Sequence, residues 1–567
     1  MNQFMETSRN ETDAPFKTLH GALRDAASHD PQRIAFECLG QTLRYETLYR
    51  LAGQFAARLR VLGIGPGHYV GIRASHSLET VIAVFGVLQS GAAYVPIDPV
   101  APPERLRAIL QSLDIQCLVS DRALPTADDT ANASQQETPL RHIIHSTDWQ
   151  PDRSSASCND GIRHWYWDEM LSNPATLDQH VPLDSPAYVM FTSGSTGVPK
   201  GILHTHFSGG AYARFTVDTY AIDADDQIAC VSPLHFDMST FGYYAATLAG
   251  CTTILVPPAH VMMPASLAQR LRETQPSIIY SVPHALIQLD SRGGRLHDDV
   301  LGKLRLVVYA GEALDSAALN QLRRRWPSTS FSNAYGPAET NVCTVQEIPS
   351  WKDQPRDLYG NQAIPIGRSW HQTQCRVVDE HDQPVAAGEL GELIVHSPTT
   401  MRHYVGGTVD DQQCFWMDAA TGNRFYRTGD CVFADADGVL HFRGRRDRRI
   451  KRRGFRIELG EIESAAARCD TIRDAAANLV NDQLHLWVQC ETRSVGNAEL
   501  ISIERSLRQS LRSTLSLAAA MPDVIHVCDT LPRTSNGKID HVRLCKEMSV
   551  DSANTVPPPR SGVLHRG

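Results

Sequence analysis

The chain has 567 residues, of which 42% are hydrophobic and 21% are charged, and its formal net charge is −9. A chain of this length is too long to fold around a single hydrophobic core, so we expect at least two domains. The composition is that of an ordinary soluble enzyme. The negative charge argues against a nucleic-acid partner, and the lack of an apolar run of about 18 residues argues against a membrane span.

Other sequence features indicate a cytoplasmic protein. The first residues, "MNQFMETSRNETDAPF", lack the basic and apolar regions of a signal peptide. The 13 cysteines are scattered without a CxxC pair, which is typical of reduced cysteines rather than of disulfides or a zinc site.

The first part of the chain alternates helical and strand patterns. "LRYETLYRLAGQFAARLRVLGI" predicts an amphipathic helix and "YVGIRA" a strand. "SLETVIAVFGVLQSG" then predicts a helix that ends at Gly91, and "AAYVPID" a further strand. This alternation indicates an α/β fold with largely parallel sheets.

Residues 121–180 interrupt this alternation, and we expect a surface loop or insertion there. The alternation resumes with "AYVMF" and continues through "DQIACVSPL", "CTTILVPP", "SIIYSV" and "LRLVVYAG". From about residue 364 the strands become short, which predicts a small β subdomain. After a basic run come a short helix (458–468), two strands, a longer helix (498–515) and a last strand.

These patterns predict four parts. Residues 1–14 form a disordered N-terminus, and residues 15–446 form a large N-terminal domain of βα-layered sheets with a small β subdomain. Residues 447–548 form a small, mobile α+β domain, and residues 549–567 a disordered tail.

The stretch "YVMFTSGSTGVPKGILHTH" (188–206) places a glycine-punctuated, hydroxyl-rich loop directly after an apolar strand. Such loops bind phosphates, because glycine lets the backbone N–H groups approach an anion. The spacing differs from a Walker P-loop, since Lys200 is followed by Gly201 instead of Ser or Thr. The structural alternative is a hydrophilic turn between a strand and a helix.

The loop resembles the signature of adenylate-forming enzymes, which include acyl-CoA synthetases, luciferases and the adenylation domains of nonribosomal peptide synthetases. Six further stretches match in the expected order: "GAAYVPIDP" (91–99), "HFDMS" (235–239), "NAYGPAET" (333–340), "YRTGD" (426–430), "GRRDRRIKRRGFRIELGEIE" (444–463) and "LPRTSNGKID" (531–540). Within this superfamily the chain is most similar to free-standing amino-acid:carrier-protein ligases.

The resemblance implies a reaction in two halves that uses ATP and Mg²⁺. A carboxylate first attacks the α-phosphate of ATP, which releases pyrophosphate, and a thiol then takes the acyl group. The implied ATP-binding residues are Thr192, Ser193, Gly194, Ser195, Thr196, Lys200, Ala334, Tyr335, Asp430 and Arg445. In this set the loop and Lys200 bind the leaving phosphates, Tyr335 stacks on adenine, and Asp430 accepts from the ribose hydroxyls.

The resemblance also implies the catalytic residues Glu339, Thr340 and Lys538. Glu339 is the expected magnesium ligand, Thr340 a donor to the α-phosphate, and Lys538 a bridge between the substrate carboxylate and the α-phosphate. Three further residues serve the second half-reaction: Asp447 as the hinge of the small domain, Gly454 lining the tunnel for the pantetheine arm, and His235 gating the thiol.

The expected substrate class depends on Asp237. In amino-acid-activating members an aspartate at this place pairs with the α-ammonium of the substrate, and a carboxylate beside Phe236 and Phe241 is costly without such a cation. The alternative is an aspartate that caps a helix starting at Met238.

The remaining substrate positions implied by the family pattern are Met238, Phe241, Tyr280, Val308, Ala310, Ala334, Val342 and Cys343. None of them carries a charge, so we expect a small to medium apolar side chain. The set resembles the pockets of prolyl-carrier-protein ligases, which makes L-proline the first expected substrate.

The expected partner is a separate phosphopantetheinylated carrier protein in natural-product biosynthesis. No carrier signature follows Lys538 and no condensation motif precedes residue 19. The family usually has less basic residues at the positions of Arg449, Arg452 and Arg453, and this difference favours an acidic partner. A basic run of this kind is also typical of a nuclear signal or an anionic-surface patch. Two alternative functions remain open, an acyl-CoA synthetase and a non-catalytic carrier-binding protein.

Overall fold

The computed structural model describes residues 16–124, 138–147, 161–175, 180–192, 199–292, 301–360, 362–406, 414–445, 449–453, 455–469, 471–480, 482–490, 497–515, 518–528, 530–533, 539, 541 and 544. The chain forms two compact units, the first reaching Asp447 and the second including Ile457–Gly567. Each unit is described by itself below. The predicted limits and roles of the two domains stay predictions.

A nine-stranded sheet organises the first unit, in the order β16-β15-β14-β13-β12-β10-β11-β1-β2. The strands from β14 to β1 run parallel, and antiparallel strands border them at both edges. The strands are β1 (Ile34–Cys38), β2 (Gln41–Arg44), β10 (Gln227–Cys230), β11 (Thr252–Leu255), β12 (Ile278–Ser281), β13 (Leu306–Tyr309), β14 (Ser330–Tyr335), β15 (Thr344–Ile348) and β16 (Arg368–Ser369).

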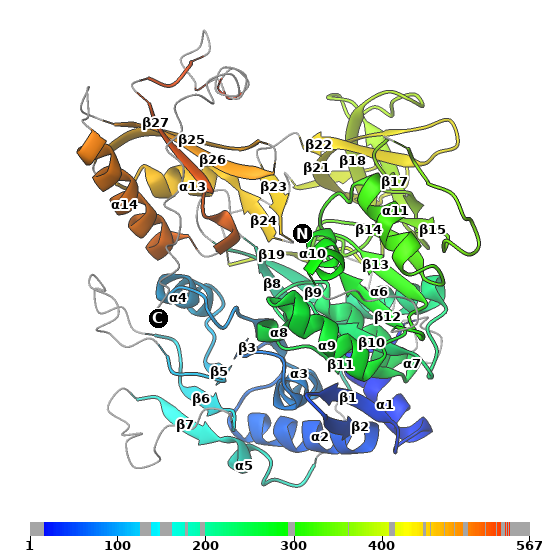
Figure 1. Cartoon of the computed structure of the whole chain (residues 1–567). Helices are drawn as coiled ribbons and strands as arrows, with labels where there is room; N and C mark the ends of the chain where they lie inside the picture. Colours follow the sequence, from blue (N-terminus) through cyan, green and yellow to red (C-terminus); the bar gives the residue numbers. More distant parts are fainter. Residues whose placement is uncertain are drawn as a thin grey trace, which may run out of the picture. The chain divides into compact units, whose positions relative to one another are not determined.

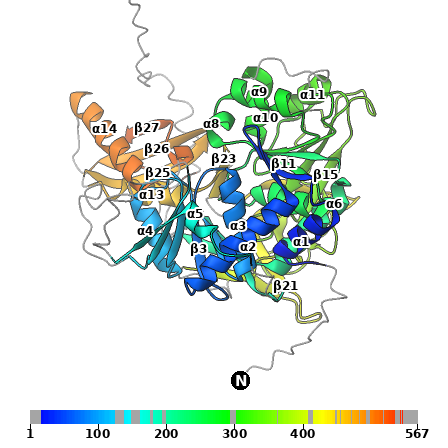
Figure 2. The same cartoon turned by 90° about the horizontal axis from the view of Figure 1, so that it is seen from below.

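Helices cover both faces of this sheet, because alternate residues of each strand are apolar on opposite sides. Ile279 and Val307 face a core built with α9 (Pro264–Thr274), α10 (Pro283–Arg292) and α11 (Ser316–Arg325), which lie together in Figure 2. Tyr280 and Val308 face α6 (His206–Tyr220) and the π-helix η3 (Phe241–Ala245) on the other side.

An eight-stranded sheet follows the order β19-β9-β8-β4-β3-β5-β6-β7. One face packs on α2 (Tyr45–Val61) and α3 (Leu78–Ser90), and the other on α4 (Pro103–Ser112). Its strands are β3 (Tyr69–Arg73), β4 (Ala93–Pro96), β5 (Cys117–Ser120), β6 (His142–His145), β7 (Arg163–Tyr166), β8 (Pro186–Thr192), β9 (Lys200–Thr205) and β19 (His403–Val405).

The expectation that residues 121–180 form only a loop or insertion is wrong. Strands β6 and β7 from this stretch extend the parallel sheet beyond β5. Both are short, and β7 ("RHWY") is rich in polar and aromatic residues because it is the edge strand of the sheet. The polar segment 125–137 lies outside the described residues.

The predicted β subdomain is a five-stranded antiparallel sheet. Its strands are β17 (Gln374–Val378), β18 (Gly391–His396), β20 (Phe415–Met417), β21 (Arg424–Ala434) and β22 (Leu440–Arg445). The long β21 carries Asp430, and β22 places Arg445 directly opposite it. The subdomain therefore brings together two of the residues expected to bind the nucleotide.

The second unit has the α+β character that the sequence predicts. Strand β26 (Gln483–Cys490) lies between β25 (Ile472–Val480) and β27 (Val524–Cys528), and α13 (Leu459–Ala466) and α14 (Asn497–Thr514) complete the unit. Strands β23 (Arg449–Arg452) and β24 (Phe455–Glu458) pair as a two-stranded ribbon.

Short helices fill the remaining connections of the first unit: α1 (Leu19–His29), α5 (Trp167–Met170), α7 (Ala246–Ala249) and α8 (Pro258–Val261) (Figure 1). The predicted end of α3 is confirmed, since Gly91 adopts a left-handed conformation with φ 85°. No helix in the described part of the chain combines the length and the apolar character that a membrane crossing requires.

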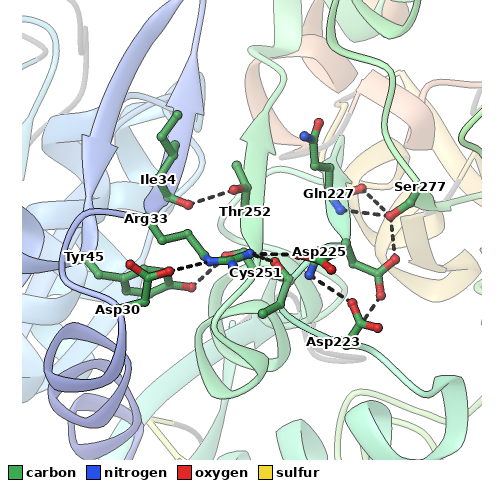
Figure 3. Close-up of polar contacts among 12 residues, drawn as sticks. Asp30, Arg33, Ile34, Tyr45, Asp223, Asp225, Gln227, Cys251, Thr252 and Ser277 are labelled. Atoms are coloured by element: carbon green, nitrogen blue, oxygen red, sulfur yellow. Dashed lines mark hydrogen bonds and ion pairs between the residues drawn. The ribbon is translucent and has the colours of Figure 1, made fainter.

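Polar contacts tie down the amino ends of the parallel strands (Figure 3). Thr252, the first residue of β11, donates to the carbonyl of Ile34 at 2.7 Å, and the backbone N–H of Gln227 donates to Ser277 Oγ at 2.8 Å. Tyr45 donates to the carbonyl of Cys251 at 2.6 Å. This end of the sheet is therefore closed, and the opposite, carboxyl ends are where parallel α/β sheets bind ligands.

Candidate active site

The hydroxyl-rich loop joins two antiparallel strands. Thr192 ends β8, Lys200 begins β9, and the two residues lie directly opposite each other. The alternative of a turn between a strand and a helix is therefore wrong. The loop residues Ser193, Gly194, Ser195 and Thr196 lie outside the described residues.

Strand pairing connects Lys200 to the expected magnesium ligand. Ile202 follows Lys200 by two residues, so both side chains lie on one face of β9. Tyr404 on β19 is paired with Ile202, and its hydroxyl donates to Glu339 Oε1 at 2.6 Å. The β9–β19 pair therefore connects the strand that begins at Lys200 to the carboxylate of Glu339 through Tyr404.

Glu339 and Thr340 are both buried, with exposed fractions of 1% and 0%. The backbone N–H of Met401 donates to the carbonyl of Glu339 at 2.7 Å, and Thr399 donates to the carbonyl of Thr340 at 2.6 Å. This segment is therefore anchored by its backbone, and the Thr340 hydroxyl also donates to the carbonyl of Pro337 at 3.2 Å. A carboxylate is a donor type that suits Mg²⁺.

The surroundings of Glu339 indicate how a metal could be held. Among the residues that the structure describes, no group of three or more His, Cys, Asp or Glu side chains could hold a metal ion. Mg²⁺ commonly uses one or two carboxylates together with phosphate oxygens, so Glu339 alone fits such a role beside a nucleotide.

His204 lies next to this segment and is neutral at physiological pH. Its Nε2 lies 3.0 Å from the carbonyl of Ala338, and its Nδ1 lies 3.2 Å from Ser208 Oγ. Burial lowers the pKa of His204 to about 4, an effect that the backbone carbonyl and the negative charge of Glu339 oppose. The neutral ring therefore supports the Glu339 segment without adding charge.

The residues expected at the adenosine part of ATP form one buried cluster. The Tyr335 hydroxyl and the Arg445 guanidinium donate to different oxygens of Asp430. Asp430 is 2% exposed, and burial, followed by the charge of Asp430, raises the pKa of Tyr335 well above its usual value. A carboxylate has about four acceptor positions, so two remain for hydroxyl donors such as those of a ribose.

Strand alternation separates this cluster from the substrate pocket. Ala334 and Tyr335 are neighbours at the end of β14, and their side chains point to opposite sides of the sheet. Val342 and Cys343 repeat the pattern: Val342 lies with Ala334, whereas Cys343 lies with Tyr335 and donates to its carbonyl at 3.4 Å. Cys343 is thus on the nucleotide side, apart from the other expected pocket residues.

Five of the expected substrate positions surround one hollow. Met238 and Ala310 belong to the same hydrophobic cluster. The lining residues are Tyr212, Thr216, Tyr220, Phe241, Tyr280, Val308, Ala334, Val342 and Trp370.

Asp237 lies in the turn that leads into the π-helix. Its Oδ1 accepts from the backbone N–H of Met238 at 2.8 Å, and its carbonyl accepts from the N–H of Thr240 at 3.0 Å. Burial raises the pKa of both Tyr212 and Tyr280, and the negative charge of Asp237 adds to this. The carboxylate therefore lies close enough to act on two residues of the pocket wall.

The helix that we expected to start at Met238 differs from an ordinary α-helix. Residues 237 and 238 form a turn, and Phe241–Ala245 form a π-helix, a conformation that occurs frequently at functional sites. Gly242 lies in this segment, and a Cβ there would meet Cys230 Cβ at 2.8 Å. The close approach of the π-helix to β10 depends on that glycine.

His235, the expected gate, is partly buried beside Asp98. The Nε2 atom of His235 lies 3.9 Å from Asp98 Oδ2, and its ring centroid lies 4.9 Å from that of Phe236. Burial lowers the pKa of His235, an effect that Asp98 opposes and Arg105 reinforces. The other residues expected for the second half-reaction, Asp447 and Gly454, lie outside the described residues, as does the expected catalytic residue Lys538.

Several residues of the site were not predicted from the sequence. Tyr404 and Trp370 reach it from segments with no pattern of their own. Tyr212, Thr216 and Tyr220 recur every four residues on α6, and this helical stripe is the signal that could have placed them in the pocket wall.

Comparisons with known proteins agree with this geometry. A family model described as "AMP-binding enzyme" matches residues 23–405. The L-proline–[L-prolyl-carrier protein] ligase of Pseudomonas fluorescens is 31% identical over 535 residues, which cover 94% of this chain and 99% of that protein. The AMB antimetabolite synthetase AmbB of Pseudomonas aeruginosa is 31% identical over 559 residues, 97% of this chain but 40% of that longer protein.

A solved structure shows the same fold. The Vibrio cholerae adenylation domain AlmE, in complex with glycyl-adenosine-5'-phosphate, superposes with a TM-score of 0.76 at 21% identity, covering 97% of this chain and 99% of AlmE. The family match spans most of the chain, and the ligase of P. fluorescens matches it nearly end to end. The chain therefore belongs to the family of AMP-binding enzymes and is an AMP-forming ligase.

Proposed function

We propose that this enzyme activates an amino acid with ATP and passes it to the phosphopantetheine thiol of a separate carrier protein. The first half-reaction joins the substrate carboxylate to the α-phosphate and releases pyrophosphate. In the second, the thiol attacks the aminoacyl-AMP, so that a thioester forms and AMP and a proton leave. The first expected substrate is L-proline or another small apolar amino acid.

One observation carries this proposal: the carboxylate of Asp237 lies beside the pocket wall formed by Phe241, Tyr280 and their neighbours. A partly buried carboxylate next to aromatic rings is stabilised by a cation, and the α-ammonium of an amino acid supplies one. The lining side chains are uncharged, which favours an apolar substrate side chain. The similarity to a prolyl-carrier-protein ligase supports the same substrate class.

The proposed nucleotide contacts follow from the buried clusters. Asp430 accepts from the ribose hydroxyls, with Arg445 holding its other oxygen, and Tyr335 faces the adenine. The loop 192–197 and Lys200 bind the β- and γ-phosphates, and Thr340 donates to the α-phosphate. Mg²⁺ held by Glu339 would neutralise charge that develops on the phosphates.

The proposed second half-reaction rests on the matching motifs. Lys538 bridges the substrate carboxylate and the α-phosphate during adenylation. Asp447 is the hinge about which the small domain rotates, Gly454 leaves room for the pantetheine arm, and His235 gates the thiol. The exposed Arg453 favours an acidic carrier, whereas Arg452 is only 3% exposed.

The test of the first half-reaction is amino-acid-dependent exchange of pyrophosphate into ATP over a panel that includes L-proline. Removing one partner of a buried ion pair costs about 3–5 kcal/mol, so Asp237→Ala should lower kcat/KM for the preferred amino acid by about 10²–10³-fold or more. Asp218→Ala is the matched control, because Asp218 pairs with Arg214 on the exposed side of α6.

The deaminated analogue distinguishes the alternatives. Cyclopentanecarboxylate keeps a ring and a carboxylate but has no ammonium, so Asp237→Ala should not lower its activation. An enzyme that uses such acids better than any amino acid, with or without Asp237, is an acyl-CoA synthetase. If no acid drives exchange while the protein still binds a carrier, the chain is a non-catalytic carrier-binding protein.

The second half-reaction is tested with separate carrier proteins in their phosphopantetheinylated form. Intact-protein mass spectrometry should show the carrier gaining the mass of the amino acid less one water, only in the presence of ATP and the preferred amino acid. A carrier that lacks the phosphopantetheine arm is the control. Aminoacyl-AMP formation without any transfer would contradict this half of the proposal.

A further inference from the structure

One residue of the wall of the hollow, Trp370, lies outside the set of expected substrate positions. Trp370 lines the hollow together with Thr216 of α6 and is 4% exposed. It directly follows β16, a two-residue strand at the edge of the nine-stranded sheet. Its ring centroid lies 6.0 Å from that of Tyr212 and 5.8 Å from that of Phe215.

The other walls of the pocket are held by the scaffold. Tyr280, Val308 and Ala334 lie on β12, β13 and β14, each of which has a neighbouring strand on both sides. The Tyr220 hydroxyl lies 3.0 Å from Ser332 Oγ, so a shorter residue there would leave a buried polar group unpaired. Changes at these positions therefore disturb more than the pocket.

Trp370 differs from these residues in how it is held. Its backbone N–H donates to the carbonyl of Cys343 at 3.2 Å, and this bond does not depend on the side chain. Its indole Nε1 makes no hydrogen bond to any of the described residues. A shorter side chain at this position therefore breaks no hydrogen bond that the structure describes and removes only packing.

We propose that Trp370 sets the upper size limit for the amino acid side chain that this pocket accepts. The inference rests on the proposed function, because it concerns the same pocket. The indole ring is part of the wall of this hollow, so it occupies space that a large substrate side chain would need. The substrate class is then an amino acid with a side chain no larger than the pyrrolidine ring of proline, and aromatic side chains are excluded.

The test compares Trp370→Leu with the unmodified enzyme in pyrophosphate exchange with L-proline, L-pipecolate, L-leucine and L-phenylalanine. One methylene in an apolar pocket changes selectivity by about 10–200-fold. We expect the ratio of kcat/KM for the larger acids to that for proline to rise at least about tenfold in the variant. Trp370→Phe should change the ratio in the same direction but less.

A matched control separates the pocket from general loosening of the core. Trp326 is fully buried on the opposite face of the same sheet, in the core formed with α11. Trp326→Leu therefore removes an equal volume outside the pocket and should leave the selectivity ratio unchanged. Thermal unfolding of each variant identifies those that are folded, and Trp370→Phe carries the test if Trp370→Leu does not fold.

The possible outcomes separate the two proposals. An unmodified enzyme that is silent with every amino acid overturns the proposed function and this inference with it. An active enzyme whose folded Trp370 variants keep the original ratio overturns the inference alone. An equal rise in the Trp326→Leu variant would also overturn it, because the effect would then not come from the pocket.

Discussion

Replacing Tyr404 by Phe removes one hydroxyl from the surroundings of Glu339. That hydroxyl donates to Glu339 Oε1 at 2.6 Å, and the glutamate is 1% exposed. A hydrogen bond to a charged group contributes about 1.5–3 kcal/mol. If Glu339 must be held in place for catalysis, the adenylation kcat/KM should fall by about 10–150-fold in Tyr404→Phe.

The assay is pyrophosphate exchange measured over a range of Mg²⁺ concentrations. We expect Tyr404→Phe to need more Mg²⁺ for half-maximal rate, because a less constrained carboxylate is a weaker ligand. Equilibrium binding of ATP in the presence and absence of Mg²⁺, measured calorimetrically, should show the same weakening without turnover. Tyr426→Phe is the matched control, since the Tyr426 hydroxyl lies 3.1 Å from that of Tyr404. A neutral hydrogen bond contributes about 0.5–1.5 kcal/mol, so this variant should lose only about 2–12-fold.

A purely structural role for Tyr404 predicts a different result. Tyr404 also pairs with Ile202 across β19 and β9, and its ring packs with Met401. If those contacts are its whole contribution, Tyr404→Phe keeps them and leaves both the rate and the Mg²⁺ dependence unchanged. That outcome would refute the positioning of Glu339 by Tyr404.

Three further predictions concern the small domain, the backbone and pH. Lys538→Ala should lower pyrophosphate exchange by at least about 100-fold, the low end of losses for a single electrostatic stabiliser, and an unchanged exchange rate would remove Lys538 from the reaction. Gly367→Ala should destabilise the protein by about 2–5 kcal/mol in urea unfolding, because φ is +88° and the new Cβ would lie 2.0 Å from the Val345 carbonyl oxygen. Gly250→Ala, with φ +72° and open space, should cost only about 1–2 kcal/mol, and equal losses would contradict the steric argument. Burial lowers the pKa of His204 to about 4 in the folded state, so the unfolded chain binds the extra proton first and stability falls as pH drops from 6.5 towards 4. The titration of His204 alone should lower the free energy of unfolding by about 1 kcal/mol between pH 7 and pH 5.5. If the unfolding midpoint of a His204→Gln variant changes with pH as much as that of the unmodified protein, this prediction is wrong.

Local sequence signals were sufficient for most of the fold. The helix that ends at Gly91 was predicted because a left-handed glycine after an apolar helical pattern is a strong local stop signal. Four strands of the nine-stranded sheet, β10 to β13, were predicted because fully buried parallel strands are short, continuous apolar runs. Val308, Ala334 and Val342, which line one hollow, were expected there only because of the resemblance to adenylate-forming enzymes.

The features that sequence reasoning missed depend on contacts between distant segments. Strand β7 carries an arginine, a histidine and two aromatic residues, so its place at the sheet edge has no apolar pattern to reveal it. Tyr404 binds Glu339 across 65 positions of sequence, and Trp370 reaches the pocket only because β16 pairs with β15. The π-helix also leaves no periodic signal, since one extra residue per turn changes which side chains face inward.

The two functional surfaces of the site share one strand end. Ala334 faces the substrate pocket and Tyr335 faces Asp430, and the next segment repeats the division with Val342 and Cys343. A slip of one residue in β14 would exchange the two sides, so the register of this strand fixes the proposed amino acid and nucleotide sites relative to each other. Because the pocket residues lie on one side only, their side chains can change without touching the Tyr335–Asp430 pair. This division explains physically how a single nucleotide-binding framework can serve acids of different size.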